Sequence, residues 1–339
     1  MGTETQRTAP TERSGVVSRA STWMENLSEQ AYAYLLLAPA FLLLTLIAFW
    51  PLFETFRMSL YADGRGGETL GEFVAIDNYV QVLTGGNPFL PREVIDLSLT
   101  SSFPFVELGE PFFRQALLVT LSFAILSVIF ETLLGFGQAF VMAKDYRGRR
   151  WFRVAIILPW AIPIVIQGMI FYLMFQPTVG FMTEPLQAIG VFGGSPLSTS
   201  RDSFFIILVA DIWKTSAFMA LLILAGMQSI DRSLYDVAKV SGASRWQQFR
   251  MITLPLVLPA LLVAMLFRTL DAMRVFGIIE TVSSCSTVPS MTCLVVETMF
   301  SARLYASAAT VAFITAGLIG VVVSVYLIKF RDTERGAYA

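Results

Sequence analysis

The sequence contains no histidine and only two cysteines, Cys285 and Cys293, which lie in one short connection. Histidine is the commonest metal ligand and the usual proton carrier near neutral pH. Its absence argues against metal-dependent and histidine-relayed chemistry, so we expect no metal site and no catalytic residue. If the connection faces outside the cell, the two cysteines are candidates for a disulfide, with two free thiols as the equal alternative.

Charged residues are also scarce. They make up 14% of the 339 residues, whereas 55% are hydrophobic, against about 25% and about 45–50% in soluble proteins. This shift indicates an integral membrane protein. The 24 Lys and Arg residues are balanced by 25 Asp and Glu residues, which leaves no basic excess for nucleic acid. No Gly-x-x-x-x-Gly-Lys-Ser/Thr loop for a nucleotide phosphate occurs either, so this chain is not expected to hydrolyse ATP.

Six apolar runs reach or approach the roughly 20 residues that cross a bilayer as a helix. They predict an all-α protein with six transmembrane helices at 33–53, 113–142, 152–175, 204–227, 256–279 and 305–330. Residues 1–30 are polar and predict a tail, followed by a transmembrane domain over 31–339.

Lys and Arg residues gather in the tail, in the connections after the second and fourth runs, and at the C-terminal end. This bias predicts a multi-pass protein of the cell membrane with both termini in the cytoplasm. The opposite connections contain few basic residues, except the long one over 54–112, which is expected to form an extracytoplasmic loop.

Several ionisable residues fall within the predicted spans, where charges are costly and mark pathways or ion pairs. Glu131 lies in the second span, for which a structural role is favoured, and Asp211 and Lys214 lie in the fourth. Arg268, Asp271 and Arg274 share one face of the fifth. These residues could contact a transported solute. The equal alternative is that they form ion pairs, Asp211 with Lys214 and Asp271 with either arginine.

Uncharged side chains extend this candidate path. Gln167, Trp213, Thr215 and Phe218 lie in the third and fourth spans. Amides hydrogen-bond to sugar hydroxyl groups, and aromatic rings stack on the C–H faces of sugars. Packing is the alternative role for each of them.

The polar stretch 229–255 between the fourth and fifth spans cannot lie in hydrocarbon, because each unsatisfied backbone group there costs several kcal/mol. Ser233 followed by Asp236 predicts a helix start with an acidic partner. Gly242 is placed to end this helix in a left-handed turn, and a second helix from about Ser244 leads into Pro255. The first helix carries an apolar stripe for which the sequence offers no internal partner.

Within this stretch, Asp236-Val237-Ala238 is followed by Gly242 and then by Ile252, Leu254 and Pro255. This pattern resembles the EAA loop of binding-protein-dependent ABC import permeases, with Asp-Val-Ala in place of the usual Glu-Ala-Ala. The resemblance implies a coupling helix that docks in a cleft of an ATPase subunit, formed by Tyr235, Asp236, Val237, Ala238, Gly242, Ala243 and Pro255. An amphipathic helix lying on the membrane surface is the alternative.

The resemblance extends over most of the chain from about residue 33. Segments similar to sugar-type permeases of the maltose-transporter class, and to their larger subunit in particular, include Leu36-Leu37-Ala38-Pro39, Asp77-Asn78-Tyr79, Leu158-Pro159-Trp160-Ala161-Ile162-Pro163, Trp213-Lys214-Thr215 and Phe267-Arg268-Thr269-Leu270-Asp271. Val119-Thr120 departs from the pattern, since many relatives place Asn before Thr.

The resemblance implies one of two permease subunits of an ATP-driven importer for a sugar, a di- or monosaccharide of the trehalose and maltose class. The expected partners are a second permease, two ATPase subunits that bind ATP and Mg, and an extracytoplasmic binding protein. This chain itself is expected to bind no cofactor. An ion-coupled secondary transporter is the alternative, although the sequence shows no repeat of the kind that such transporters contain. A membrane-embedded enzyme would need reactive groups that the sequence lacks.

Overall fold

The computed structural model of the protein describes residues 27–64, 68–87, 90–95 and 112–337, with side chains as far as 329. The chain divides into two compact units, Met1–Arg57 and Met58–Ala339. The predicted all-α membrane fold is confirmed. In the described ranges five helices are long and apolar enough to cross a membrane, or six if one sharply bent pair is counted as a single span.

The first span is a continuous helical stretch of 31 residues, longer than the predicted 33–53. It consists of α2 (Glu29–Leu44), a π-helical turn η1 (Thr45–Phe49) and α3 (Trp50–Ser59). The Ser28 hydroxyl caps its start by accepting from the Ala31 N–H at 3.3 Å, as serine does at helix starts. Most of the predicted tail 1–30 lies outside the described residues.

A hairpin follows, in which β1 (Tyr61–Asp63) pairs antiparallel with β2 (Leu70–Phe73). In helix α4 (Asp77–Leu83), the Asn78 amide donates to the carbonyls of Ser59 at 2.9 Å and of Tyr61 in β1 at 2.5 Å. The Asp63 carboxylate accepts from the backbone N–H groups of Ala306 at 2.8 Å and Ser307 at 3.2 Å. Asp63 thereby caps α16 (Tyr305–Ala337) and ties the start of the predicted loop 54–112 to the last helix.

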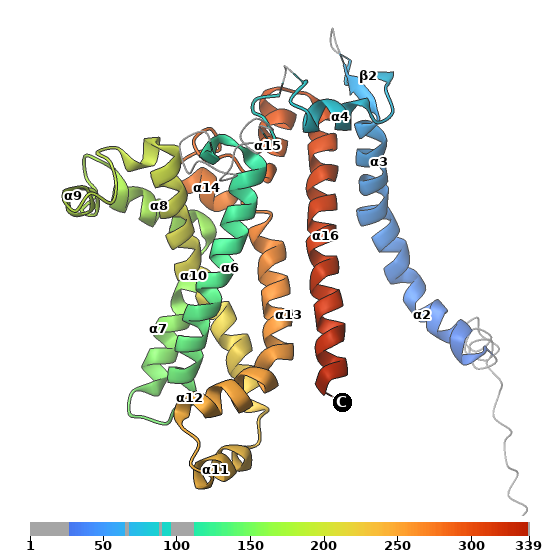
Figure 1. Ribbon diagram of the computed structural model, residues 1–339. Helices are drawn as coiled ribbons and strands as arrows, with labels where there is room; N and C mark the ends of the chain where they lie inside the picture. The colour runs from blue at the N-terminus through green and yellow to red at the C-terminus, as the bar shows by residue number, and fades with distance from the viewer. Residues whose placement is uncertain (1–26, 65–67, 88–89, 96–111, 338–339) are drawn as a thin grey trace, which may run out of the picture. The chain divides into compact units, whose positions relative to one another are not determined.

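The second unit is a bundle of long helices (Figure 1). Helix α10 (Ser200–Gln228) packs along α6 (Ala116–Ala143) and α13 (Leu254–Ala272), and α13 packs along α16. A Cβ atom at Gly135 of α6 would lie 2.8 Å from the Met219 side chain of α10, so glycine permits the close approach of these two helices. α6, α10 and α16 lie where the sequence predicts spans.

The third predicted span, 152–175, which contains Pro159 and Pro163, is sharply bent. The structure has two helices there, α7 (Arg149–Ala161) and α8 (Ile164–Phe175), bent by 95° at the break. Pro163 has no N–H and disfavours helical geometry in the residue before it. Ile162 is accordingly extended, with φ −73° and ψ 131°. We call this break the elbow.

The fifth span lies earlier in the chain than the predicted 256–279. One helical run extends from Arg245 to Ala272 through α12 (Arg245–Gln248), the π-helical turn η4 (Phe249–Thr253) and α13, whereas α14 (Gly277–Val282) is a separate short helix. Pro255 is the second residue after η4, as Pro51 is the second residue after η1. A π-helical turn is one way in which a helix adjusts to the N–H that proline lacks.

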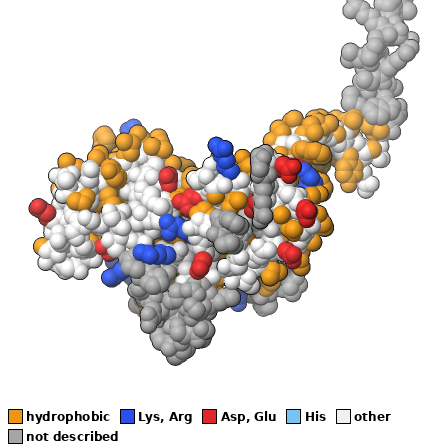
Figure 2. Space-filling model, turned by 90° about the horizontal axis from the view of Figure 1, so that it is seen from above, with side chains coloured by type: hydrophobic (Ala, Val, Ile, Leu, Met, Phe, Trp, Pro, Cys, Tyr) orange, Lys and Arg blue, Asp and Glu red, His pale blue; other side chains and the backbone are white. Residues whose placement is uncertain are grey.

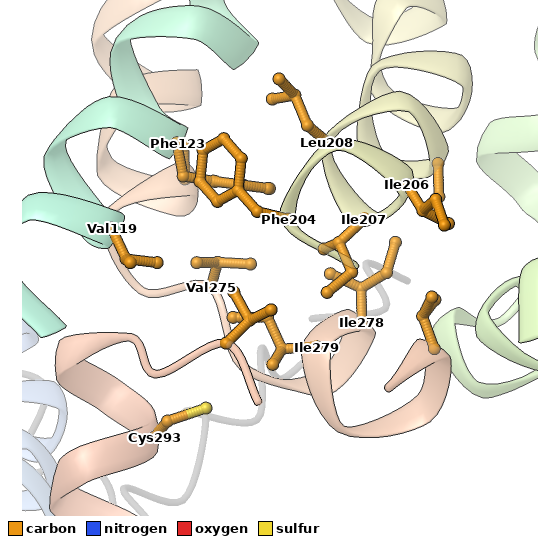
Figure 3. Packing of buried hydrophobic residues seen from close by; sticks show 14 of the residues in the cluster. Val119, Phe123, Phe204, Ile206, Ile207, Leu208, Val275, Ile278, Ile279 and Cys293 are labelled. Carbon is orange, nitrogen blue, oxygen red and sulfur yellow. The ribbon is translucent and has the colours of Figure 1, made fainter. Parts of the chain in front are cut away.

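The largest hydrophobic core lies where α6, α10 and α14 meet (Figure 3). Phe123 of α6 and Phe204 of α10 contact each other edge to face, and Ile279 of α14 is fully buried in the same core. The remaining described helices are α11 (Arg232–Val240), α9 (Thr183–Ala188), α15 (Met291–Val296), η2 (Phe112–Arg114), η3 (Pro196–Ser198) and η5 (Glu297–Ser301).

The two ends of the bundle differ in the elements that they present. One end carries α4, α14 and α15, and the other carries α11 and α12 (Figure 1). Seen from the α4 end, acidic and basic side chains are scattered over the face, with hydrophobic side chains toward its margins (Figure 2). A disulfide joins Cys285 and Cys293 at this end, and both residues are buried.

We predict that Asp63→Ala lowers the stability of the protein by about 1–2 kcal/mol, because the first N–H groups of α16 lose their cap. Thermal unfolding of the purified protein measures the effect. Glu72→Ala, an exposed acidic position in β2, is the matched control and is expected to unfold like the wild type. Equal unfolding temperatures for the two variants would show that the cap contributes nothing.

Candidate functional site

The polar stretch after α10 folds into two short helices, but its first helix starts differently from the prediction. Asp231 caps α11, since its carboxylate accepts from the Ser233 N–H at 2.9 Å. Ser233 therefore lies inside the helix and is not its cap. Asp236, predicted as the acidic partner of that cap, pairs with Lys239 at 3.0 Å instead.

The Asp231 cap also has an electrostatic signature. Hydrogen bonds from the Ser233 backbone and then from its side chain hold the pKa of the Asp231 carboxyl below its ordinary value. A lowered pKa in the folded state means that the ionised cap contributes stability above the ordinary Asp range. This contribution is lost only as the pH falls through the lowered pKa.

Gly242 ends α11 as the sequence predicts. Its φ is +80°, the left-handed region that glycine enters without cost. The Ala243 N–H then donates to the Ala238 carbonyl at 2.9 Å. Ser244 starts α12 with a capping box, exchanging hydrogen bonds with Gln247. The loop therefore leads without interruption into the helical run that contains α13.

One face of α11 is apolar and exposed. Val237 is 66% exposed and Val240 is 91% exposed, and Leu234 lies one turn before them. Tyr235 faces the bundle, where its hydroxyl lies 2.9 Å from that of Thr253. The predicted residues of the coupling helix thus divide into an anchor, Tyr235, and an outward apolar face that has no partner within the described residues.

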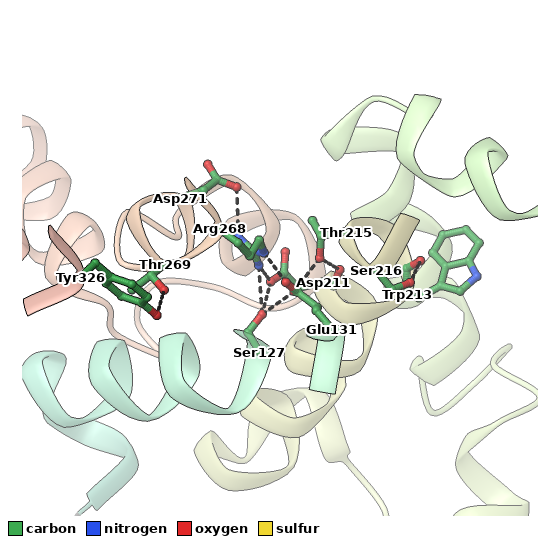
Figure 4. Close-up of polar contacts among 10 residues, drawn as sticks. All are labelled: Ser127, Glu131, Asp211, Trp213, Thr215, Ser216, Arg268, Thr269, Asp271 and Tyr326. Atoms are coloured by element: carbon green, nitrogen blue, oxygen red, sulfur yellow. Dashed lines mark hydrogen bonds and ion pairs between the residues drawn. The ribbon is translucent and has the colours of Figure 1, made fainter. Parts of the chain in front are cut away.

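Arg268 of α13 lies at the centre of a charged cluster that joins three helices (Figure 4). Its guanidinium donates to Glu131 of α6 at 2.5 Å, to Asp211 of α10, and to Asp271 one turn along α13 at 3.0 Å. The side chain of Arg268 is 3% exposed and that of Glu131 is fully buried, whereas that of Asp271 is 70% exposed. We call these four residues the Arg268 cluster.

Hydroxyl groups complete the hydrogen bonding of the buried carboxylates. Ser127 Oγ lies 2.6 Å from Glu131 and 2.8 Å from Asp211, and Thr215 Oγ1 donates to Glu131 at 2.5 Å. Burying ions is favourable only when the remaining lone pairs are also bonded. Ser127 was not a sequence candidate, although its position four residues before Glu131 on the same helical face was an available signal.

The structure separates the other predicted charges from this cluster. Of the two alternatives for Asp211 and Lys214, the ion pair between them is not formed, because Asp211 binds Arg268 while the Lys214 ammonium donates to the Ile162 carbonyl at 2.8 Å. Arg274 is exposed and bonds to the Leu270 carbonyl, so the partner of Asp271 is Arg268. A cavity of about 110 Å³ lies beside the cluster and is lined by Asp211, Arg268, Asp271 and Arg274, among others.

The uncharged candidates lie elsewhere around α10. Gln167 is fully buried and donates to the Ala210 carbonyl at 2.5 Å. Trp213 packs on Phe171 and lines a second cavity, of about 330 Å³, together with Gln138 and other residues of α6, α7 and α10. Phe218 stacks on Trp160, with ring centroids 6.4 Å apart. Trp160 and Gln138 were not sequence candidates, although Trp160 lies within one of the segments that carry the family resemblance.

We predict that Arg268→Met destabilises the protein by about 3–5 kcal/mol, because Glu131 and Asp211 are then buried without their cation. Chemical unfolding of the purified protein measures the change. Arg274→Met, the exposed arginine nearby, serves as the control and should change stability little. Adding Glu131→Gln to Arg268→Met should recover part of the loss; a further loss would contradict the assignment of the pair.

A family model described as "Binding-protein-dependent transport system inner membrane component" matches residues 131–331. The trehalose/maltose transport system permease protein MalF of Thermococcus litoralis is 35% identical over 74% of this chain and 76% of its own. The trehalose transport system permease protein SugA of Mycobacterium tuberculosis is 28% identical over 98% of this chain and 96% of its own.

Among solved structures, a chain of a bacterial ABC transporter involved in the import of alginate matches with a TM-score of 0.67. The two sequences are 20% identical, and the match covers 93% of this chain and 99% of the alginate transporter chain. This likeness supports the fold. The family match includes the α11–α12 loop and the Arg268 cluster. This chain therefore belongs to the binding-protein-dependent transport system inner membrane components, and it is a multi-pass membrane permease rather than an enzyme.

Proposed function

We propose that this chain is one of the two permease subunits of an ATP-driven importer that takes up a sugar. Two ATPase subunits, which bind ATP and Mg, dock at the α11–α12 end, and an extracytoplasmic binding protein delivers the sugar at the opposite end. Family membership supports the dependence on a binding protein. The lack of a phosphate-binding loop in this sequence agrees with ATP hydrolysis in separate subunits.

The observation that carries this proposal is the exposed apolar face of α11. The turn after α11 leads into a helical run that continues into the membrane. Val237 and Val240 are exposed at the tip, and the run from Arg245 to Ala272 connects the loop to Arg268. Amphipathic helices bind partner proteins by laying such a face into a hydrophobic groove. Movement of an ATPase groove would therefore act directly on α13.

The arrangement of the bundle ends supports a cytoplasmic position for the α11–α12 loop. This loop, the basic turn between α6 and α7, and the end of α16 lie at the same end of the bundle, opposite the end with the disulfide (Figure 1). Basic segments favour the cytoplasmic side, and disulfides persist in oxidising compartments. Both features favour a cytoplasmic position for the end of α16.

Two features support a sugar as the solute. MalF is named for trehalose and maltose transport and SugA for trehalose transport, which favours a di- or monosaccharide of that class. The second cavity also offers an indole ring from Trp213 and an amide from Gln138, and Trp160 and Phe218 stack nearby. Rings and amides are the groups that hold neutral sugars. None of the relatives reported above favours the ion-coupled alternative.

We predict that Gly242→Leu lowers both uptake and the ATPase activity stimulated by the binding protein about tenfold in the reconstituted complex. A side chain in the left-handed region costs about 1–2 kcal/mol and would change the direction in which α12 leaves α11. Gly190→Leu is the matched control, because Gly190 has φ +72°, also meets open space, and lies in the loop after α9. Wild-type uptake and ATPase activity in Gly242→Leu would sink the proposed coupling role.

The sugar assignment has its own test. We predict that binding protein loaded with trehalose or maltose stimulates ATP hydrolysis by the complex, whereas amino acids do not. Trp160→Leu should reduce sugar uptake about 3- to 10-fold, the equivalent of losing about 0.5–1.5 kcal/mol of aromatic contact. Trp151→Leu, an exposed tryptophan on the same helix, is the control. Stimulation by amino acids alone would refute a sugar importer.

A further inference from the structure

The elbow between α7 and α8 leaves a backbone carbonyl that lies outside both helices. α7 ends at Ala161 and α8 begins at Ile164, and Ile162 between them is extended. Within a membrane an unsatisfied carbonyl is expensive, and broken helices persist only where other groups supply the missing hydrogen bonds. The Ile162 carbonyl accepts from the Lys214 ammonium of α10 at 2.8 Å.

The charge of Lys214 is thus directed at a backbone dipole. Among the described residues Lys214 forms no ion pair within 4.0 Å, and its side chain is half-buried. A charged donor makes a shorter and stronger hydrogen bond than a neutral one.

A second bond holds the other side of the elbow to the same part of α10. Gln167 of α8, fully buried, donates to the Ala210 carbonyl at 2.5 Å. Lys214 therefore fixes the end of α7, and Gln167 fixes α8, from two adjacent turns of one helix. Together these two bonds link the segments on both sides of the 95° bend to α10.

The same two turns of α10 also hold the Arg268 cluster. Asp211 binds Arg268, and Thr215 binds Glu131, so residues 210–215 contact the elbow and α13 at once. A displacement of α13 transmitted through Arg268 would reach Lys214 within a single helical turn. The cavity of about 110 Å³ between Ile164 and Arg268 leaves space for such a displacement.

Beyond the elbow, α8 is tightly joined to α14. A Cβ atom at Gly168 would lie 1.8 Å from the Thr281 hydroxyl, so the two helices are in backbone-level contact. α8 and α14 must then move together. The elbow is the joint between this pair and α7.

We propose that Lys214 is a positioning residue for transport, whose ammonium holds the elbow at the Ile162 carbonyl and makes α8 and α14 follow α13 during each cycle. Lys214 is thereby assigned a role in the geometry of the path in place of contact with the solute. The uptake part of its test rests on the proposed function, whereas the distance measurement below does not.

The first experiment measures coupling in the complete complex reconstituted in liposomes. Lys214→Met keeps the length of the side chain and removes the donor. Sugar uptake is expected to fall about tenfold while ATP hydrolysis changes less than twofold, because the ATPase contact at α11 is intact. Lys144→Met, an exposed lysine in the turn between α6 and α7, should behave as wild type. An unchanged ratio of sugar to ATP in Lys214→Met overturns the proposal.

Chemical rescue distinguishes the loss of the Lys214 amine from general damage to the fold. Lys214→Cys treated with 2-bromoethylamine regains an amine at nearly the length of lysine. The two native cysteines of this chain are bonded to each other, so the introduced thiol is the group that reacts. More than half of the lost uptake should return, with no effect of the same treatment on Lys144→Cys. Complete alkylation by mass spectrometry without recovery counts against the role of the amine.

The second measurement reports the elbow itself. Spin labels at two exposed positions, Trp151→Cys on α7 and Tyr172→Cys on α8, give a distance distribution in the purified complex. It should be narrow with Lys214 and broader or shifted in Lys214→Met. Identical distance distributions in the presence of Lys214 and in Lys214→Met would refute the positioning role of Lys214, whichever solute is transported. If the wild-type complex takes up no sugar, the proposed substrate fails, but this comparison still decides the role of Lys214.

Discussion

The structure depends on the need to neutralise charge where water is absent. Arg268 can lie in the middle of the bundle only because Glu131 and Asp211 face it from two other helices. The bonds of Ser127 and Thr215 leave little hydrogen-bonding capacity unused. Because neither Glu131 nor Asp211 can leave Arg268 without an unpaired charge remaining buried, α6, α10 and α13 are held to one another as a group.

Proline accompanies several of the departures from regular helical geometry, and these departures differ in size. Pro51 and Pro255 each follow a π-helical turn and leave the helix continuous. Pro163 instead accompanies a 95° bend, where Lys214 bonds to the Ile162 carbonyl. At this break a donor from a neighbouring helix bonds to the carbonyl that lies outside both helices.

Hydropathy was sufficient to predict most spans, because the cost of burying polar backbone is a local property of each segment. It could not predict the elbow, since an apolar run carries no information about direction. Which side chains bond to each other was even harder to predict from the sequence. Arg268 and Glu131 are 137 positions apart, and nothing near Lys214 in sequence indicates Ile162. The helix start at Asp231 was missed because Ser233 and Asp231 are both good capping residues and only the backbone path distinguishes them.

The helical run from Arg245 to Ala272 contains no break in the described structure. At about 1.5 Å per residue, Arg268 lies about 35 Å from the start of this run. A lever of that length, supported by the capping box of Ser244 at one end and by ion pairs at the other, converts a small tilt at its base into a larger sideways displacement at its tip. The ion pairs of the Arg268 cluster oppose this displacement. Their strength therefore determines how much force the loop must exert to move the helix.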